Sequence, residues 1–123
     1  MAAGKYALLI EQGATLNLDL VYKDSSNVPI NLTDYIGRMQ IKSGYADSNP
    51  TTYISLGSVS PQPDGTGLII DAISGSINIF ISAASSSVLT FDTAYYDLEL
   101  QAPTGIVTRL IEGTVKLSKQ VTI

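Results

Sequence analysis

Three carboxylates, Asp92, Asp97 and Glu99, have the residue types and spacing that could support acid–base chemistry or bind a calcium ion. A calcium site usually gathers several oxygen ligands in one loop, and the sequence contains no Asp-x-Asp-x-Asp-Gly pattern. Asp97 and Glu99 alternate with apolar residues, which is typical of the solvated face of a strand. We therefore interpret these carboxylates as surface residues, and we predict no metal site, no cofactor and no catalytic residue.

A second candidate for chemistry is the segment Asp64-Gly65-Thr66-Gly67, because glycine-rich loops can bind phosphate groups. Such a loop needs a preceding strand, a following helix and usually a lysine, and the sequence around residues 64–67 predicts none of these. Pro61 and Pro63 lie just before it. This pattern predicts a turn within a long surface loop.

The residue types that the chain lacks exclude several functional classes. Its 123 residues include no histidine and no cysteine, which excludes a Ser-His-Asp triad, a thiol nucleophile, a Cys/His zinc site and disulfide bonds. The net charge of −4 opposes binding to nucleic acid. No apolar segment resembles a signal peptide or approaches the ~20 residues of a membrane-spanning helix. We predict a protein that is not an enzyme, is made in the cytoplasm, and binds neither nucleic acid nor membrane.

Aromatic and loop residues are better candidates for binding a partner. Tyrosine is common in sheets, so most of the seven tyrosines are expected to be partly buried. Tyr45 and Tyr53 flank a polar loop and are predicted to be the exposed pair. Together with Pro61, Pro63 and Asp64 of the next long loop, they form our predicted set of partner-binding residues.

Alternation of apolar and polar residues predicts strands along most of the chain. The predicted strands are residues 5–11, 16–22, 36–42, 52–56, 68–70, 77–81, 95–101 and 106–118, and a short helix capped by Ser82 is expected over 83–89. The alternation directs Leu18, Ile79, Leu98 and Leu100 inward. Short loops between consecutive strands favour antiparallel pairing.

Two further details follow from the strand pattern. The alternation in the last strand slips between Leu110 and Val115, which predicts a β-bulge at Glu112-Gly113. Arg38 and Arg109 lie in predicted strands of an acidic protein, and we expect them to pair with Glu99, Glu112 or Asp97.

These elements predict an all-β fold in one domain, residues 1–123. We expect an antiparallel two-sheet sandwich, immunoglobulin-like or jelly-roll-like, of about eight strands with at most one short helix. A partly open barrel is the alternative. The long loops near residues 43–51 and 57–67 favour the sandwich, and we expect them at one of its ends.

The polar surface is unusual, because serine, threonine and asparagine replace most charged residues. Monomeric proteins usually protect their strand edges with lysines or prolines. The first strand, residues 5–11, and the last, which runs toward Ile123, have few such residues. This composition predicts a protein that is packed against copies of itself or other partners.

Several segments resemble small proteins of tailed bacteriophages and prophages. They are Gly4-Lys5-Tyr6, Glu11-Gln12-Gly13-Ala14-Thr15, Asn31-Leu32-Thr33-Asp34-Tyr35, Arg38-Met39-Gln40-Ile41, Tyr96-Asp97-Leu98-Glu99-Leu100 and Thr108-Arg109-Leu110-Ile111-Glu112-Gly113-Thr114-Val115. The likeness covers Gly4 to Ser118, and Asp34 stands where we expect glycine. The layout is more distantly similar to the N-terminal β-sandwich domain of siphophage baseplate upper proteins, which anchors receptor-binding parts to the baseplate.

The resemblance implies a virion structural protein that docks one component of a tail or baseplate onto another, such as a fibre or receptor-binding apparatus. The expected partners are other virion proteins and copies of this chain in a symmetric assembly, bound through loops at one sandwich end and an outer strand. A capsid decoration or cement protein is the alternative within the same particle. A carbohydrate-binding module is the alternative from another functional class.

Overall fold

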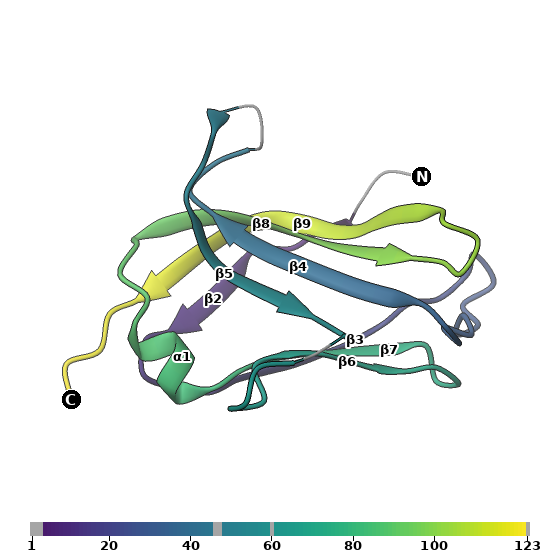
Figure 1. The fold of residues 1–123 in the computed structure, drawn as a ribbon, viewed down its shortest axis with the longest axis horizontal. Helices are drawn as coiled ribbons and strands as arrows, with labels where there is room; N and C mark the ends of the chain where they lie inside the picture. The colour runs from purple at the N-terminus through teal and green to yellow at the C-terminus, as the bar shows by residue number, and fades with distance from the viewer. Residues whose placement is uncertain (1–3, 46–47, 60, 123) are drawn as a thin grey trace.

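Two β-sheets pack face to face in the computed structural model, which describes residues 4–45, 48–59 and 61–122 (Figure 1). The six-stranded sheet has the order β1-β9-β8-β4-β5, with β2 also paired to β9. Its strands are β1 (Gly4–Lys5), β2 (Leu8–Glu11), β4 (Ile36–Lys42), β5 (Thr52–Gly57), β8 (Thr93–Gln101) and β9 (Val107–Ser118). The three-stranded sheet has the order β3-β7-β6, with β3 (Leu16–Val21), β6 (Gly67–Asp71) and β7 (Ser76–Ile81). The predicted all-β sandwich is confirmed.

The core lies between the sheets and follows from the period-two pattern. Along β8 every second residue is buried, ending with Leu98 and Leu100, and Ile79 is equally inaccessible on the facing sheet. Leu18 is half-buried and packs against this core. The four inward residues predicted from the alternation therefore all contribute to the core, because a strand that buries one face must direct alternate side chains there.

The chain passes from one sheet to the other through α1 (Ala83–Ser87), which lies between β7 and β8 (Figure 1). Ser82 caps the helix as predicted, because its hydroxyl accepts a hydrogen bond from the Ser85 backbone N–H at 3.1 Å. The helix ends two residues earlier than expected, since Leu89 turns into the core. Within the described part of the chain, no helix has the length and apolar character needed to cross a membrane.

The N-terminal strands depart from the expected antiparallel arrangement. The predicted strand 5–11 is divided into β1 and β2, and both pair with β9 in parallel. Loop length predicts the direction of strands that follow each other in the chain, whereas these strands lie at opposite ends of it. As a consequence β9 lies inside the sheet, so the expectation that the last strand forms an exposed edge is wrong.

The β-bulge in β9 is real, but its predicted position is wrong. Ile111 pairs with Leu98 and Arg109 pairs with Glu99, which leaves Leu110 as the extra residue. Gly113 instead pairs regularly with Tyr96, and a Cβ at this position would overlap with the Tyr6 carbonyl oxygen. The glycine therefore permits a close backbone approach between β9 and the segment that joins β1 to β2.

Asp34 adopts the backbone conformation that a glycine would favour. Its φ is 64°, in the left-handed region, which aspartate tolerates better than most residues. The turn before β4 is therefore formed with aspartate in place of the expected glycine.

Candidate functional site

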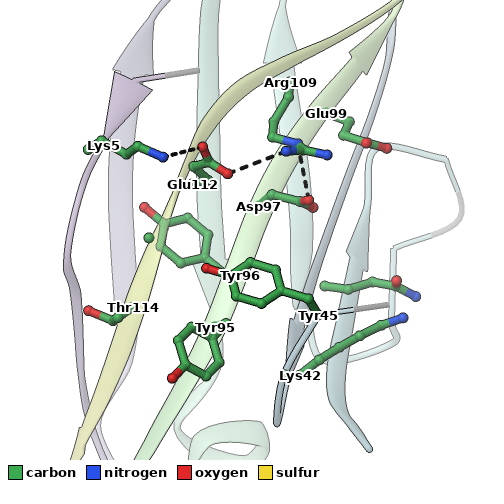
Figure 2. A pocket seen from close by; sticks show the side chains of 13 residues that line it. Lys5, Lys42, Tyr45, Tyr95, Tyr96, Asp97, Glu99, Arg109, Glu112 and Thr114 are labelled. Atoms are coloured by element: carbon green, nitrogen blue, oxygen red, sulfur yellow. Dashed lines mark hydrogen bonds and ion pairs between the residues drawn. The ribbon is translucent and has the colours of Figure 1, made fainter. Parts of the chain in front are cut away.

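A hollow of about 650 Å³ opens on the outer face of the six-stranded sheet. Residues of β4, β8 and β9 that do not enter the core project outward and line it. The register places Asp97 between Gln40 and Glu112, and it places Tyr95 beside Lys42. Figure 2 shows the side chains around this hollow, which come from strands far apart in the sequence.

A chain of ion pairs crosses the hollow (Figure 2). Glu112 pairs with Lys5 on one side and with Arg109 on the other, where the Nη1–Oε1 distance is 3.4 Å. The Arg109 Nε atom lies 3.4 Å from Asp97 Oδ2. Side chains from β1, β9 and β8 are thereby connected across the sheet.

Arg38 forms a separate ion pair with Glu99, at 3.3 Å between Nη2 and Oε1. The expected pairing of Arg38 and Arg109 with neighbouring carboxylates is therefore confirmed. All of these side chains are partly exposed, and such pairs contribute about 0–1 kcal/mol each. Their main effect is to neutralise much of the charge on this face.

The carboxylates in this network differ in their pKa shifts. Burial and the nearby Glu99 carboxylate raise the pKa of Asp97, while Arg109 acts in the opposite direction. The hydrogen bond from Lys5 lowers the pKa of Glu112. Burial is the main cause of the first shift and the neighbouring cation of the second, since desolvation favours the neutral acid and a nearby cation favours the carboxylate.

The three carboxylates first considered for metal binding interact with different cations. Asp92 lies 3.6 Å from Lys119, away from the pairs formed by Asp97 and Glu99. Among the residues that the structure describes, no group of three or more acidic side chains is arranged to hold a metal ion.

The tyrosines predicted to be an exposed pair have different environments. Tyr45 is 67% exposed, lines the hollow, and packs on Tyr95 with 5.3 Å between ring centroids. Tyr53 is half-buried and stacks on Phe91 at 4.8 Å. The expected exposure is confirmed for Tyr45 only, because a register shift at the start of β5 turns Tyr53 toward the core.

Asp64 has a structural role in its loop. Its carboxylate accepts hydrogen bonds from the Ser82 and Ser85 hydroxyls at 2.5 and 2.6 Å, and from the Thr66 backbone N–H at 3.0 Å. These bonds lower the pKa of Asp64, with the Ser82 hydroxyl contributing most. Gly65 adopts a φ of 89°, so the segment forms the predicted turn. The Asp64 carboxylate therefore connects the loop between β5 and β6 to the N-terminus of α1 by hydrogen bonds.

Replacing Asp64 with asparagine is expected to lower the melting temperature at pH 7, and the difference from wild type should decrease steadily as the pH falls below 3.8. The folded-state pKa lies well below the ordinary value of 3.8, so the stabilisation is complete above 3.8, decreases progressively below it, and is lost only as the pH passes through the folded-state pKa. Thermal melts of wild type and Asp64→Asn at pH 7 and at several pH values below 3.8 test the prediction. Asp92→Asn is the control, since that side chain is 95% exposed. An equal difference between wild type and variant at pH 7 and at the lowest pH measured would contradict it.

The five predicted partner-binding residues do not form one patch. The loop with Tyr45 and the loop with Pro61, Pro63 and Asp64 leave β5 at its opposite ends, so their expected place at one sandwich end is wrong. Pro61 and Pro63 are exposed, but only Tyr45 lines the hollow. The sequence reasoning missed Lys42 and Tyr95, which the alternation places on outward faces but which only strand pairing brings together.

The comparisons with known proteins support the fold and carry no assignment of function. No family model matches the sequence, and a search of curated proteins finds no match. The fold is similar to that of many solved chains, including a crystal structure of a chicken TCR with a TM-score of 0.55 and 13% sequence identity. That alignment covers 98% of this chain and 56% of the TCR chain. The pairing of β9, β8, β4 and β5 in one sheet and β3, β7 and β6 in the other is the immunoglobulin-like arrangement.

Proposed function

We propose that this chain is a structural docking protein of a tailed-bacteriophage virion, located in the tail or baseplate. The resemblance of its segments between Gly4 and Ser118 to phage proteins suggests the particle. The fold is compatible with many functions, so the argument for docking depends on the surface.

The strand edges are the observation that carries this proposal. Three strands that end a sheet, β3, β5 and β6, contain no lysine, arginine or proline. An edge without such residues can accept a further strand from another protein, with backbone hydrogen bonds for affinity and neighbouring side chains for specificity. Tyr45, in the loop between β4 and β5, is exposed and can add contact area, as exposed tyrosines often do at interfaces.

Particle imaging tests this function. Virions assembled with the gene should carry the protein in symmetric sets, and those assembled without it should lack a tail or baseplate component. Ser55→Lys places a charge on β5 and should reduce the number of copies in the particle, whereas the control Val88→Lys, at an exposed position beside α1, should not. Intact and infectious particles that never contained the protein would overturn the proposal.

The same images separate the tail or baseplate from the alternative location. Copies found on the capsid surface would identify a decoration or cement protein, which would act through the same kinds of contact. The difference between the two lies in the partner.

One observation favours a second candidate function, carbohydrate binding. Tyr45 and Tyr95 border the hollow, and Gln40, Asp97 and Thr114 offer hydrogen-bonding groups beside them. Aromatic rings with adjacent polar groups can bind a sugar through its apolar face and its hydroxyls. A glycan array tests this candidate: saturable binding of a defined sugar that Tyr45→Ala abolishes would support it, and absence of binding would exclude the sugars tested.

A further inference from the structure

The charges of this protein are divided unequally between its two sheets. The strands of the six-stranded sheet contain five basic residues, Lys5, Arg38, Lys42, Arg109 and Lys116, and four acidic ones, Glu11, Asp97, Glu99 and Glu112. Strands β3, β6 and β7 contain no basic residue and two acidic ones, Asp19 and Asp71. The two outer surfaces of the sandwich, here called the six-stranded face and the three-stranded face, therefore differ in charge.

Two cations on the six-stranded face are not neutralised by the ion-pair network. The carboxylates of Asp97, Glu99 and Glu112 are occupied by the two arginines and Lys5. Within residues 4–45, 48–59 and 61–122, neither Lys42 nor Lys116 has an ion-pair partner. Lys42 lines the hollow, and Lys116 is exposed on β9.

The three-stranded face has the opposite character. Asp19 and Asp71 are exposed there, and in the described part of the chain neither pairs with a cation. The apolar side chains of Val21 and Ile69 are 50% and 59% exposed beside them. This face therefore combines negative charge with uncovered apolar surface.

The spacing of the two cations matches that of the two carboxylates. Lys42 lies opposite Tyr95, which lies opposite Thr114, and Lys116 is two residues further along β9. This displacement is two strand spacings across the sheet and two residues along it. With about 4.8 Å between strands and about 3.3 Å per residue, the two lysine backbones are ~12 Å apart.

The carboxylates on the other face have the same displacement. Asp19 lies opposite Asn78, which lies opposite Ile69, and Asp71 is two residues further along β6. The separation is again two strand spacings and two residues, or ~12 Å. Both lysines of one copy can therefore lie opposite both aspartates of another copy at the same time.

This geometry points to head-to-tail self-association, in which the six-stranded face of one copy binds the three-stranded face of the next. Lys42 and Lys116 would pair with Asp19 and Asp71, and Tyr45 would contribute apolar contact near the other copy's three-stranded face. The inference rests on the proposed docking function and specifies one partner, a second copy of this chain. Because the two faces are different surfaces, the interface is heterologous, and each pair of copies leaves one face of each kind free for further copies.

Analytical ultracentrifugation of the whole chain at low salt tests this inference. The average mass should rise with protein concentration, and about 0.5 M NaCl should return the chain to the monomer, because salt screens the ion pairs. A monomer at every concentration at low salt, or an oligomer unaffected by salt, would overturn head-to-tail pairing through these charges.

Charge reversal provides the sharper experiment. Lys42→Glu/Lys116→Glu and Asp19→Lys/Asp71→Lys should each raise the concentration needed for assembly at least about tenfold. An equal mixture of the two variants should assemble again, since each altered face then meets a complementary one. Lys23→Glu/Lys119→Glu is the control for the Lys42→Glu/Lys116→Glu variant, because it lowers the net charge by the same amount without altering Lys42 or Lys116, and it should assemble like wild type. Circular dichroism melts establish that each variant is folded. If Asp19→Lys/Asp71→Lys unfolds, Asp19→Asn/Asp71→Asn takes its place in the measurement of assembly.

The mixture distinguishes this inference from other modes of assembly. If one face paired with the same face of another copy, mixing the two charge-reversed variants would not restore assembly. Failure of two folded variants to assemble in the mixture would overturn the head-to-tail arrangement. The docking function is tested separately by particle imaging. A chain that is monomeric in solution yet present in the virion would contradict self-association and leave docking to other proteins intact.

Discussion

Replacement of Leu98 by alanine is expected to lower the free energy of unfolding by ~2–5 kcal/mol. Leu98 is fully inaccessible in the middle of β8, between Met39 on β4 and Ile111 on β9. The substitution removes apolar burial and leaves a cavity that the surrounding sheet can only partly fill. Small domains have total stabilities of about 5–15 kcal/mol, so this single change removes a large fraction.

Urea unfolding followed by circular dichroism measures the effect, and two controls test its cause. Asp97→Ala alters the neighbouring residue on the outer side of the same strand, where loss of a surface ion pair should cost at most about 1 kcal/mol. Leu9→Ala removes the same side chain from a position that is 54% exposed. If Leu98→Ala were no more destabilising than Asp97→Ala, the assignment of inner and outer faces in β8 would be wrong.

Replacement of Gly113 by alanine is expected to cost about 1–3 kcal/mol or more and to displace the N-terminal strands from β9. A Cβ at Gly113 would overlap with the Tyr6 carbonyl oxygen and lie 3.0 Å from its carbonyl carbon. These atoms belong to the backbone, so no side-chain rotation can relieve the overlap. Movement of Tyr6 would also break its backbone hydrogen bond to Glu112 and the 2.6 Å bond that it accepts from the Tyr96 hydroxyl.

Hydrogen exchange of residues 4–11, together with urea unfolding, checks this prediction. Gly4→Ala is the matched control, because a Cβ there meets its nearest neighbour at an ordinary 3.5 Å. A double-mutant cycle adds a second test: Tyr96→Phe should cost less in the Gly113→Ala background than in wild type, since the hydroxyl has already lost its acceptor. Equal effects of Gly113→Ala and Gly4→Ala would refute the close approach.

Burial also changes the titration of the Tyr96 hydroxyl. Burial, with a smaller contribution from Tyr6, raises the pKa of Tyr96 to about 12. The neutral phenol therefore persists far above neutral pH and continues to donate to the Tyr6 carbonyl. Loss of stability from this group is expected only in strongly alkaline solution, because a raised pKa means that the folded state holds the proton more tightly than the unfolded chain does.

Local patterns in the sequence predicted most of the individual elements. The alternation from Ile36 to Lys42 defines β4, and Ser82 begins α1 at the predicted residue. The segment Ser74-Gly75 forms the turn of the β6–β7 hairpin, with Gly75 at a φ of 65°. These features depend on residues within a few positions of one another, so the chain itself contains the necessary information.

The arrangement of strands at the two ends of the chain could not be predicted in this way. The pairing of β1 and β2 with β9 joins segments separated by more than 100 residues, and loop length says nothing about their direction. The bulge illustrates the same limit: the slip in alternation showed that β9 contains an extra residue, but only the register with β8 identifies it as Leu110. Glycine at position 113 marked a close backbone approach, which sequence reasoning mistook for the bulge itself.

The sequence by itself determined that this is an all-β protein without histidine or cysteine chemistry and that its strands bury one face. It also determined that its two arginines form ion pairs with carboxylates. The tertiary structure decided which outward residues meet. Lys42, Tyr95 and Thr114 are separated in sequence and form one side of the hollow because β4, β8 and β9 lie in register. Tyr45 faces solvent while Tyr53 joins the core, although both flank the same loop. The physical reason is that alternation specifies only the side of a strand on which a residue lies, whereas lateral pairing, formed by long-range burial and backbone hydrogen bonds, specifies its neighbours.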